Sequence, residues 1–199
     1  MASETGIVNL ALTLLGESRI ISLDDDTKPA REAKALYEIS RDALLAGYNW
    51  SFAATRAQIP ALVGAPVFGF GMAYQLPSDC LRIILLNEEY VGVDLTDYRG
   101  APVEKYAIEG RQILTDWSAP LNIRYVKRVT DTAQFSPNFT KAFGCQLAVD
   151  LAETLTQSGS KRDRAEAQLN KEISLAIRAN AIELHPKRLA DDDWVLSRL

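Results

Sequence analysis

Residues able to do acid–base or nucleophilic chemistry are few and scattered in this chain. The one histidine, His185, stands beside Pro186 at the expected end of a helix, where the helix dipole favours a positive charge. No serine or cysteine lies in a nucleophile motif, and the His-Glu-x-x-His and Walker A patterns are absent. We therefore expect no catalytic residue and no enzymatic activity.

Motifs for metals and cofactors are incomplete. Residues 24–26 are all Asp, but an EF-hand counted from the first of them needs glycine where Pro29 stands. Gly69-Phe70-Gly71 begins like a dinucleotide fingerprint, yet Tyr74 occupies the place of the third glycine. We therefore expect neither a metal nor a cofactor. The charges at 24–26 are expected to lead into a helix N-terminus, and the two glycines are expected to lie in a flexible loop.

Two pairs of reactive residues have ordinary explanations. Cys80 and Cys145 are far apart in the sequence and have no second ligand at metal spacing, so we expect two buried thiols in a reducing compartment. Carboxylates such as Asp79 and Glu104 would have to face each other across a cleft to hydrolyse a glycan. Spacing alone does not indicate such a pair among 26 acidic residues.

The three aromatic residues Tyr48, Trp50 and Phe52 stand between a helical and a β-type region. They suit either a ligand platform or a packing hinge, and we favour the hinge because three large rings bury much apolar area.

Charge argues against a free-standing nucleic-acid binder. The net charge is -4 and the pI near 5.1, whereas such proteins neutralise phosphates with clustered Lys and Arg. Arg124, Lys127, Arg128 and the mixed run 161–164 are expected to form solvated faces rather than phosphate contacts. With 47% hydrophobic and 24% charged residues, the chain is typical of folded globular proteins. We expect neither a signal peptide nor a membrane span, since the apolar stretch 7–15 is short and has no basic segment before it.

The elements that position these residues begin with two helices. The first is expected between an N-cap at Ser3 and a stop at Gly16, and the second between a cap at Thr27 with Pro29 in its first turn and a stop at Gly47. The two should pair as a hairpin. The second helix should bury one face and expose a polar one; the polar face carries Arg31, Glu38, Arg41 and Asp42.

A β region follows from about residue 53, where Pro and Gly become frequent. Its clearest strands are expected at 81–86, at 103–108 and 112–115 joined across Glu109-Gly110, and at 121–129. In the last strand, apolar and polar residues alternate, which predicts one buried face; the apolar series is Leu121, Ile123, Tyr125 and Val129, interrupted by Lys127.

Helical periodicity returns after Ser136-Pro137. The strongest apolar stripe of the chain recurs every four residues and consists of Phe139, Phe143, Leu147, Leu151 and Leu155. Gly159 should end this helix, and a further helix is expected over 161–183.

These elements define an α+β protein. We expect a four-helix bundle formed by N- and C-terminal helical hairpins, with an antiparallel β-sheet region inserted between them. The divisions are 1–52 for the first hairpin, 53–130 for the inserted β region, 131–185 for the second hairpin and 186–199 for a C-terminal arm.

The N-terminal stretch, residues 8–52, carries a series of motifs in a characteristic order. These are Val8-Asn9-Leu10-Ala11-Leu12-Thr13-Leu14-Leu15-Gly16-Glu17, then Ile21-Ser22-Leu23-Asp24, Ala30-Arg31-Glu32-Ala33 and Tyr48-Asn49-Trp50-Ser51-Phe52. The series resembles the opening of the tail tubular protein A family of short-tailed bacteriophages, and the same order of parts covers nearly the whole chain. It departs from that family at Tyr48-Asn49, where glycine is common, and in its last nine residues.

The resemblance implies a structural virion protein, made in the host cytoplasm and carried in the tail. It would be a head-to-tail adaptor: a twelve-subunit ring that binds the portal protein above and the tail nozzle protein below. Genomic DNA would pass through the ring without sequence-specific binding, and no membrane is involved. A weakly acidic lumen suits that passage, because a basic one would hold phosphates.

The arm after Pro186 sets apolar residues among charges, which is typical of a segment that becomes ordered on a partner. The expected partner-binding residues are Trp194, Leu196, Arg198 and Leu199. Two alternatives to the adaptor are kept open: a tail-associated hydrolase that degrades glycan, and a DNA-binding packaging factor.

Overall fold

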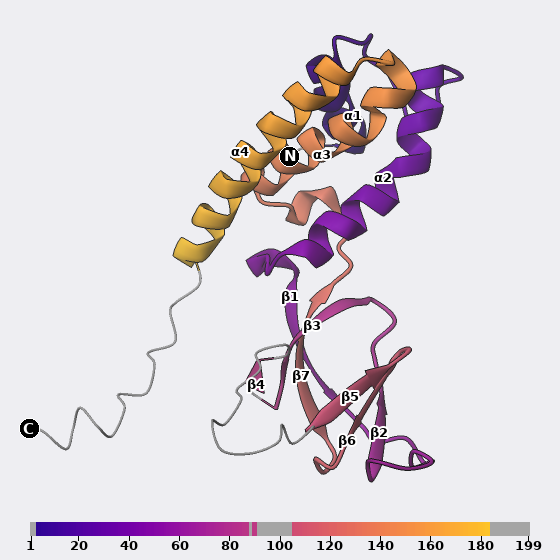
Figure 1. Ribbon diagram of the computed structural model, residues 1–199, viewed down its shortest axis with the longest axis vertical. Coiled ribbons are helices and arrows are strands. Elements are labelled where there is room, and N and C mark those ends of the chain that lie inside the picture. The colour runs from indigo at the N-terminus through magenta and orange to yellow at the C-terminus, as the bar shows by residue number, and fades with distance from the viewer. Residues whose placement is uncertain (1–2, 88, 91–104, 184–199) are drawn as a thin grey trace, which may run out of the picture.

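The computed structural model describes residues 3–87, 89–90 and 105–183 of the 199-residue chain, with the side chains of 89 and 90 left out. The protein is mixed α+β, as expected, and its helices and strands occupy separate parts joined end to end (Figure 1). Four α-helices lie in one part and two antiparallel sheets in the other.

The two N-terminal helices begin and end where the capping residues predict. Helix α1 spans Glu4–Leu15; the Ser3 hydroxyl accepts a hydrogen bond from the Gly6 amide, and Gly16 ends the helix at a φ of 70°. Helix α2 spans Lys28–Gly47 after Thr27, whose side chain accepts from the Ala30 amide. These caps satisfy backbone groups that a helix end leaves without partners.

Helices α3 and α4 are also defined by local signals. Helix α3 spans Pro137–Thr156, with the Ser136 hydroxyl accepting from the Phe139 amide. It ends at Gln157, which adopts a left-handed conformation. Helix α4 spans Gly159–Glu183, so Gly159 begins this helix two residues earlier than expected.

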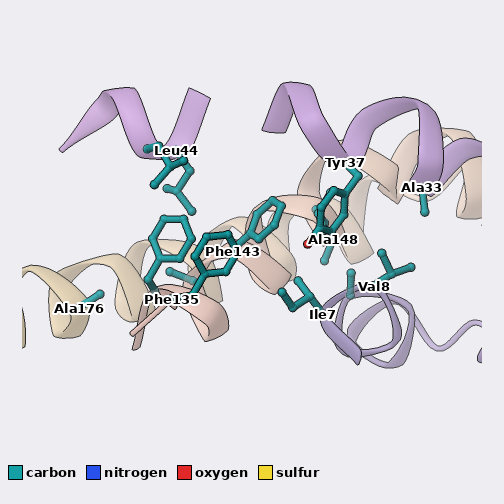
Figure 2. Packing of buried hydrophobic residues seen from close by; sticks show 14 of the residues in the cluster. Ile7, Val8, Ala33, Tyr37, Leu44, Phe135, Phe143, Ala148 and Ala176 are labelled. Atoms are coloured by element: carbon teal, nitrogen blue, oxygen red, sulfur yellow. The ribbon is translucent and has the colours of Figure 1, made fainter. Parts of the chain in front are cut away.

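Helix α3 is the centre of the helical part, and α1, α2 and α4 all pack against it. The expected pairing of the first two helices as a hairpin is therefore wrong, because the main neighbour of each is α3. The reason is that α3 buries residues on more than one side: besides Phe139, Phe143, Leu147 and Leu151 of the predicted stripe, the buried residues include Ala142, Gly144, Cys145, Ala148 and Ala152. Figure 2 shows Tyr37 of α2 directed toward Ala148 of α3, and the centroid of its ring lies 5.1 Å from that of Phe143.

The contact between α1 and α3 is very close at one glycine. A Cβ atom added to Gly144 would lie 2.6 Å from Cδ2 and 3.0 Å from Cγ of Leu10. The absence of a side chain at this position therefore lets the two helices approach, which the sequence did not indicate.

One residue of α2 was assigned to the wrong face. Arg41 was expected on the polar face, but only 3% of it is exposed. Its Nε lies 2.9 Å from Oδ1 of Asp42, which also accepts from Nε of Arg128 at 2.6 Å through its other oxygen. The paired charge explains how an arginine can be buried at this junction.

The β part contains two sheets rather than the single one expected. The first has the order β1-β7-β3-β4 and the second β2-β6-β5, with all pairings antiparallel. The strands are β1 (Ala54–Ile59), β2 (Met72–Gln75), β3 (Cys80–Leu86), β4 (Glu89–Tyr90), β5 (Tyr106–Glu109), β6 (Gln112–Thr115) and β7 (Leu121–Lys127). The expected strands correspond to β3, β5, β6 and β7, while residues 103–104 lie outside the described part.

Alternation in β7 is confirmed and has an added feature. Leu121, Ile123 and Tyr125 are buried toward the second sheet, whereas Asn122 is exposed on the opposite face. Val126, on that opposite face, is nevertheless fully buried, because it joins the core of the helical part. The outer face of the first sheet is thus covered by helices at one end and open at the other.

No helix in residues 3–87, 89–90 and 105–183 is long and apolar enough to cross a membrane.

Candidate assembly surfaces

The acidic run before α2 is occupied by local interactions. Asp24 lies 2.7 Å from Nζ of Lys34, and this contact lowers the pKa of its carboxyl. Asp25 accepts hydrogen bonds from the amides of Ile21 and Ser22, and Asp26 pairs with Arg31. The run leads into α2, as expected, and two of its carboxylates pair with side chains of that helix.

The carboxylates and thiols considered in the sequence have ordinary surroundings where the structure describes them. Asp79 accepts a hydrogen bond from the hydroxyl of Tyr125 at 3.1 Å, and Glu104 lies outside the described residues. Both cysteines are buried and free, as expected. Burial raises the pKa of the Cys145 thiol to about 11 and also raises that of Cys80, so neither is a thiolate nucleophile at neutral pH.

Within the same residues, no group of three or more His, Cys, Asp or Glu side chains is arranged to hold a metal ion. His185 and the arm residues Trp194, Leu196, Arg198 and Leu199 lie outside the described part, so their proposed roles stay predictions.

The aromatic residues after α2 form a packing hinge, as expected. Trp50 is 1% exposed, donates its indole N–H to the Leu44 carbonyl at 2.9 Å, and packs edge-on against Phe139. Phe52 contacts the same ring, with centroids 5.0 Å apart. The start of β1 is thereby fixed to α3, which holds the two parts of the molecule together.

Among the described residues of the β part, the β1–β2 connection carries the most exposed apolar side chains. Val63, Val67 and Phe68 have relative exposures of 109%, 97% and 86%. Residues 57–78 contain no Asp, Glu, Lys or Arg. We call this connection, residues 60–71, the apolar loop. It contacts the second sheet where the Leu62 amide donates a hydrogen bond to the Ala73 carbonyl. Large apolar side chains exposed on one loop are typical of interaction sites in soluble proteins.

A second group of exposed apolar residues lies on the helices. Leu175, Ile177 and Ile182 are on α4 and Ile39 is on α2. Helix α4 packs mainly against α3, and Ile177 on it is 40% exposed.

The basic residues of β7 occupy different surroundings. Arg128, just after the strand, pairs with Asp42. Arg124 lines a hollow of about 380 Å³ on the open end of the first sheet, together with Arg56 and the side chains of Gln58 and Asn122. The solvated face expected here is therefore partly an ion pair and partly a concave, positively charged surface.

Neither the protein-family models nor the curated proteins with which the chain was compared give a match in sequence.

Proposed function

We propose that the protein is a structural subunit of a head-to-tail adaptor in a short-tailed bacteriophage. Its copies would form a ring between the portal and the tail nozzle, through which the DNA passes. The order of motifs in residues 8–52 supports the family. The observation that carries the assembly role is the apolar loop, exposed at residues such as Val67 and Phe68.

The surfaces of the molecule support this proposal in a specific way. A ring needs two different faces on each subunit, one for each neighbour. The apolar loop belongs to the β part, whereas the exposed residues Leu175, Ile177 and Ile182 belong to α4 of the helical part, so these two surfaces are suited to be such a pair (Figure 1). In this proposal the helices act as one four-helix bundle, for which the packing of α1, α2 and α4 on α3 provides rigidity.

The test combines assembly with a matched pair of variants. The protein is purified alone and mixed with the portal of the same virion, and ring formation is followed by light scattering and negative-stain microscopy. The double variant Val67→Ser and Phe68→Ser should lose ring or portal binding. Ile21→Ser, which removes a 92% exposed apolar side chain from the loop between α1 and α2, should assemble as the parent does.

Three results would overturn the proposal. A protein that stays monomeric at high concentration and never binds portal is not an adaptor. Release of sugar from host polysaccharide would favour the hydrolase instead. Tight DNA binding that weakens steeply with salt would favour the packaging factor.

A further inference from the structure

Two arginines face each other across neighbouring strands of the first sheet. Arg56 on β1 is the register partner of Arg124 on β7, so both side chains project from the same face. Like charges in this relation destabilise a sheet unless an anion lies between them. Within the part of the chain that the structure describes, the side chains of Arg56 and Arg124 make no hydrogen bond or ion pair. By contrast, Arg31, Arg128 and Arg162 each have a carboxylate partner.

The surroundings of the two arginines are concave and polar. They line the 380 Å³ hollow with Gln58 and Asn122, which are the next register pair and are hydrogen-bonded through their side chains at 2.9 Å. Leu85, only 5% exposed, forms an apolar part of the wall. Guanidinium groups bind carboxylates and phosphates through paired N–H donors. The hollow therefore has the chemistry of an anion site with room for more than one carboxylate.

The end of α4 is hydrogen-bonded to the segment that leads into β1. The hydroxyl of Ser51 donates to the Glu183 carboxylate at 2.6 Å, and the side chain of Asn180 bonds both the Ser51 amide and the Asn49 carbonyl. Ser51 is only five residues before Arg56. The last described residue of the helix is thus held at the beginning of the strand that carries the first arginine.

The sequence beyond the helix supplies three adjacent carboxylates, Asp191, Asp192 and Asp193. At roughly 3.3 Å per residue, the eight steps from Glu183 to Asp191 can span about 26 Å, whereas Arg56 is at most about 17 Å from Ser51. Covalent attachment gives such a segment an effective concentration on the order of millimolar. No free anion of the cytoplasm has this advantage, and the net charge of -4 disfavours a long polyanion.

We infer that Arg56 and Arg124 form a carboxylate-binding site whose ligand is the acidic segment 191–193 of the same chain. Binding would hold the first half of the C-terminal arm on the open face of the first sheet. The inference goes beyond the adaptor proposal and does not depend on it, because the contact is measurable in the isolated subunit.

The test uses two complementary variants of the full-length chain. One replaces Asp191, Asp192 and Asp193 by Asn, and the other replaces Arg56 and Arg124 by Gln. In ¹⁵N-labelled protein, the first should shift the amide resonances of residues 56 and 124, and the second those of residues 191–193. The matched control, Arg164→Gln with Arg178→Gln, removes two exposed arginines of α4 and should leave both sets unchanged.

A second measurement follows the arm itself. Trypsin should remove it at Lys187 and Arg188 roughly fivefold faster in both test variants, since two exposed ion pairs of ordinary strength are lost, and at the parent rate in the control. Unchanged resonances at 191–193 in the arginine variant, or equal cleavage rates, would overturn the inference.

Two further experiments identify the ligand. A spin label attached to the Ser197→Cys variant should broaden the amide resonances of residues 56 and 124 of its own molecule, but not those of a ¹⁵N-labelled molecule that carries no spin label. Broadening only between molecules would overturn the intrachain assignment. The site would be a phosphate site instead if millimolar inorganic phosphate shifted the amide resonances of both arginines while the replacement of residues 191–193 by Asn left those resonances unchanged.

Discussion

Phe139 is the residue whose removal should most weaken the junction between the helices and the β part. Its ring is fully buried and packs against Trp50, Phe52 and Phe135, with centroids 5.1, 5.0 and 4.9 Å away. A Phe→Ala change in a packed core costs about 3–5 kcal/mol, and the loss of several aromatic contacts places Phe139→Ala near the upper end. For a chain of this size, the expected fall in melting temperature is about 10–20 °C.

The assay is urea denaturation followed by circular dichroism, with thermal melting as a second measure. Phe139→Leu keeps most of the volume and should cost less than half as much as alanine. Phe68→Ala, which removes an identical ring that is 86% exposed, should change stability by less than about 0.5 kcal/mol. If Phe139→Ala cost less than about 1.5 kcal/mol, or no more than Phe68→Ala, the hinge would not hold the two parts together.

Three further predictions rest on single contacts. Gly144→Ala should destabilise the protein by about 1–3 kcal/mol in urea melts, because the added methyl group meets the side chain of Leu10. Adding Leu10→Ala to the same chain should recover part of that loss. If the destabilisations of the two single variants simply added, the close contact would be contradicted. Tyr37→Phe should be neutral or stabilising, since the tyrosine hydroxyl is buried without a partner, whereas Tyr74→Phe should cost about 1 kcal/mol by removing a donor to the Trp117 carbonyl; the reverse order would refute the assignment. Both cysteines should resist a thiol-specific disulfide reagent at pH 8 and react only in denaturant. Burial raises the pKa values of both thiols, so little thiolate is present at a pH below those values. Rapid reaction of the folded protein would show that the thiols are accessible.

Short-range signals in the sequence account for the helix ends. Ser3, Thr27 and Ser136 each cap a helix through a bond to an amide three residues later, and such bonds depend only on neighbouring residues. Alternation in the last strand likewise predicts which face is buried. The aromatic hinge was predicted on the same basis, since three large rings between two regions must find apolar surface.

Long-range packing decided the remaining features. The sequence cannot show that α1 packs against α3 rather than α2, because either arrangement would bury the apolar stripe of α1. The close contact between α1 and α3 joins Leu10 and Gly144, which are 134 positions apart in the chain. Burial of Arg41 was missed for a related reason: its place on a helix face depends on Asp42 and Arg128 meeting beside it.

The candidate surfaces divide in the same way. The uncharged composition of residues 57–78 is visible in the sequence, but only the tertiary structure leaves Val67 and Phe68 exposed to solvent instead of folded into the sheet. Arg56 and Arg124 are 68 positions apart and become neighbours only through the register of β1 on β7. Caps, turns and alternation are local properties of the chain, whereas register and helix partners result from minimising exposed apolar surface over the whole molecule.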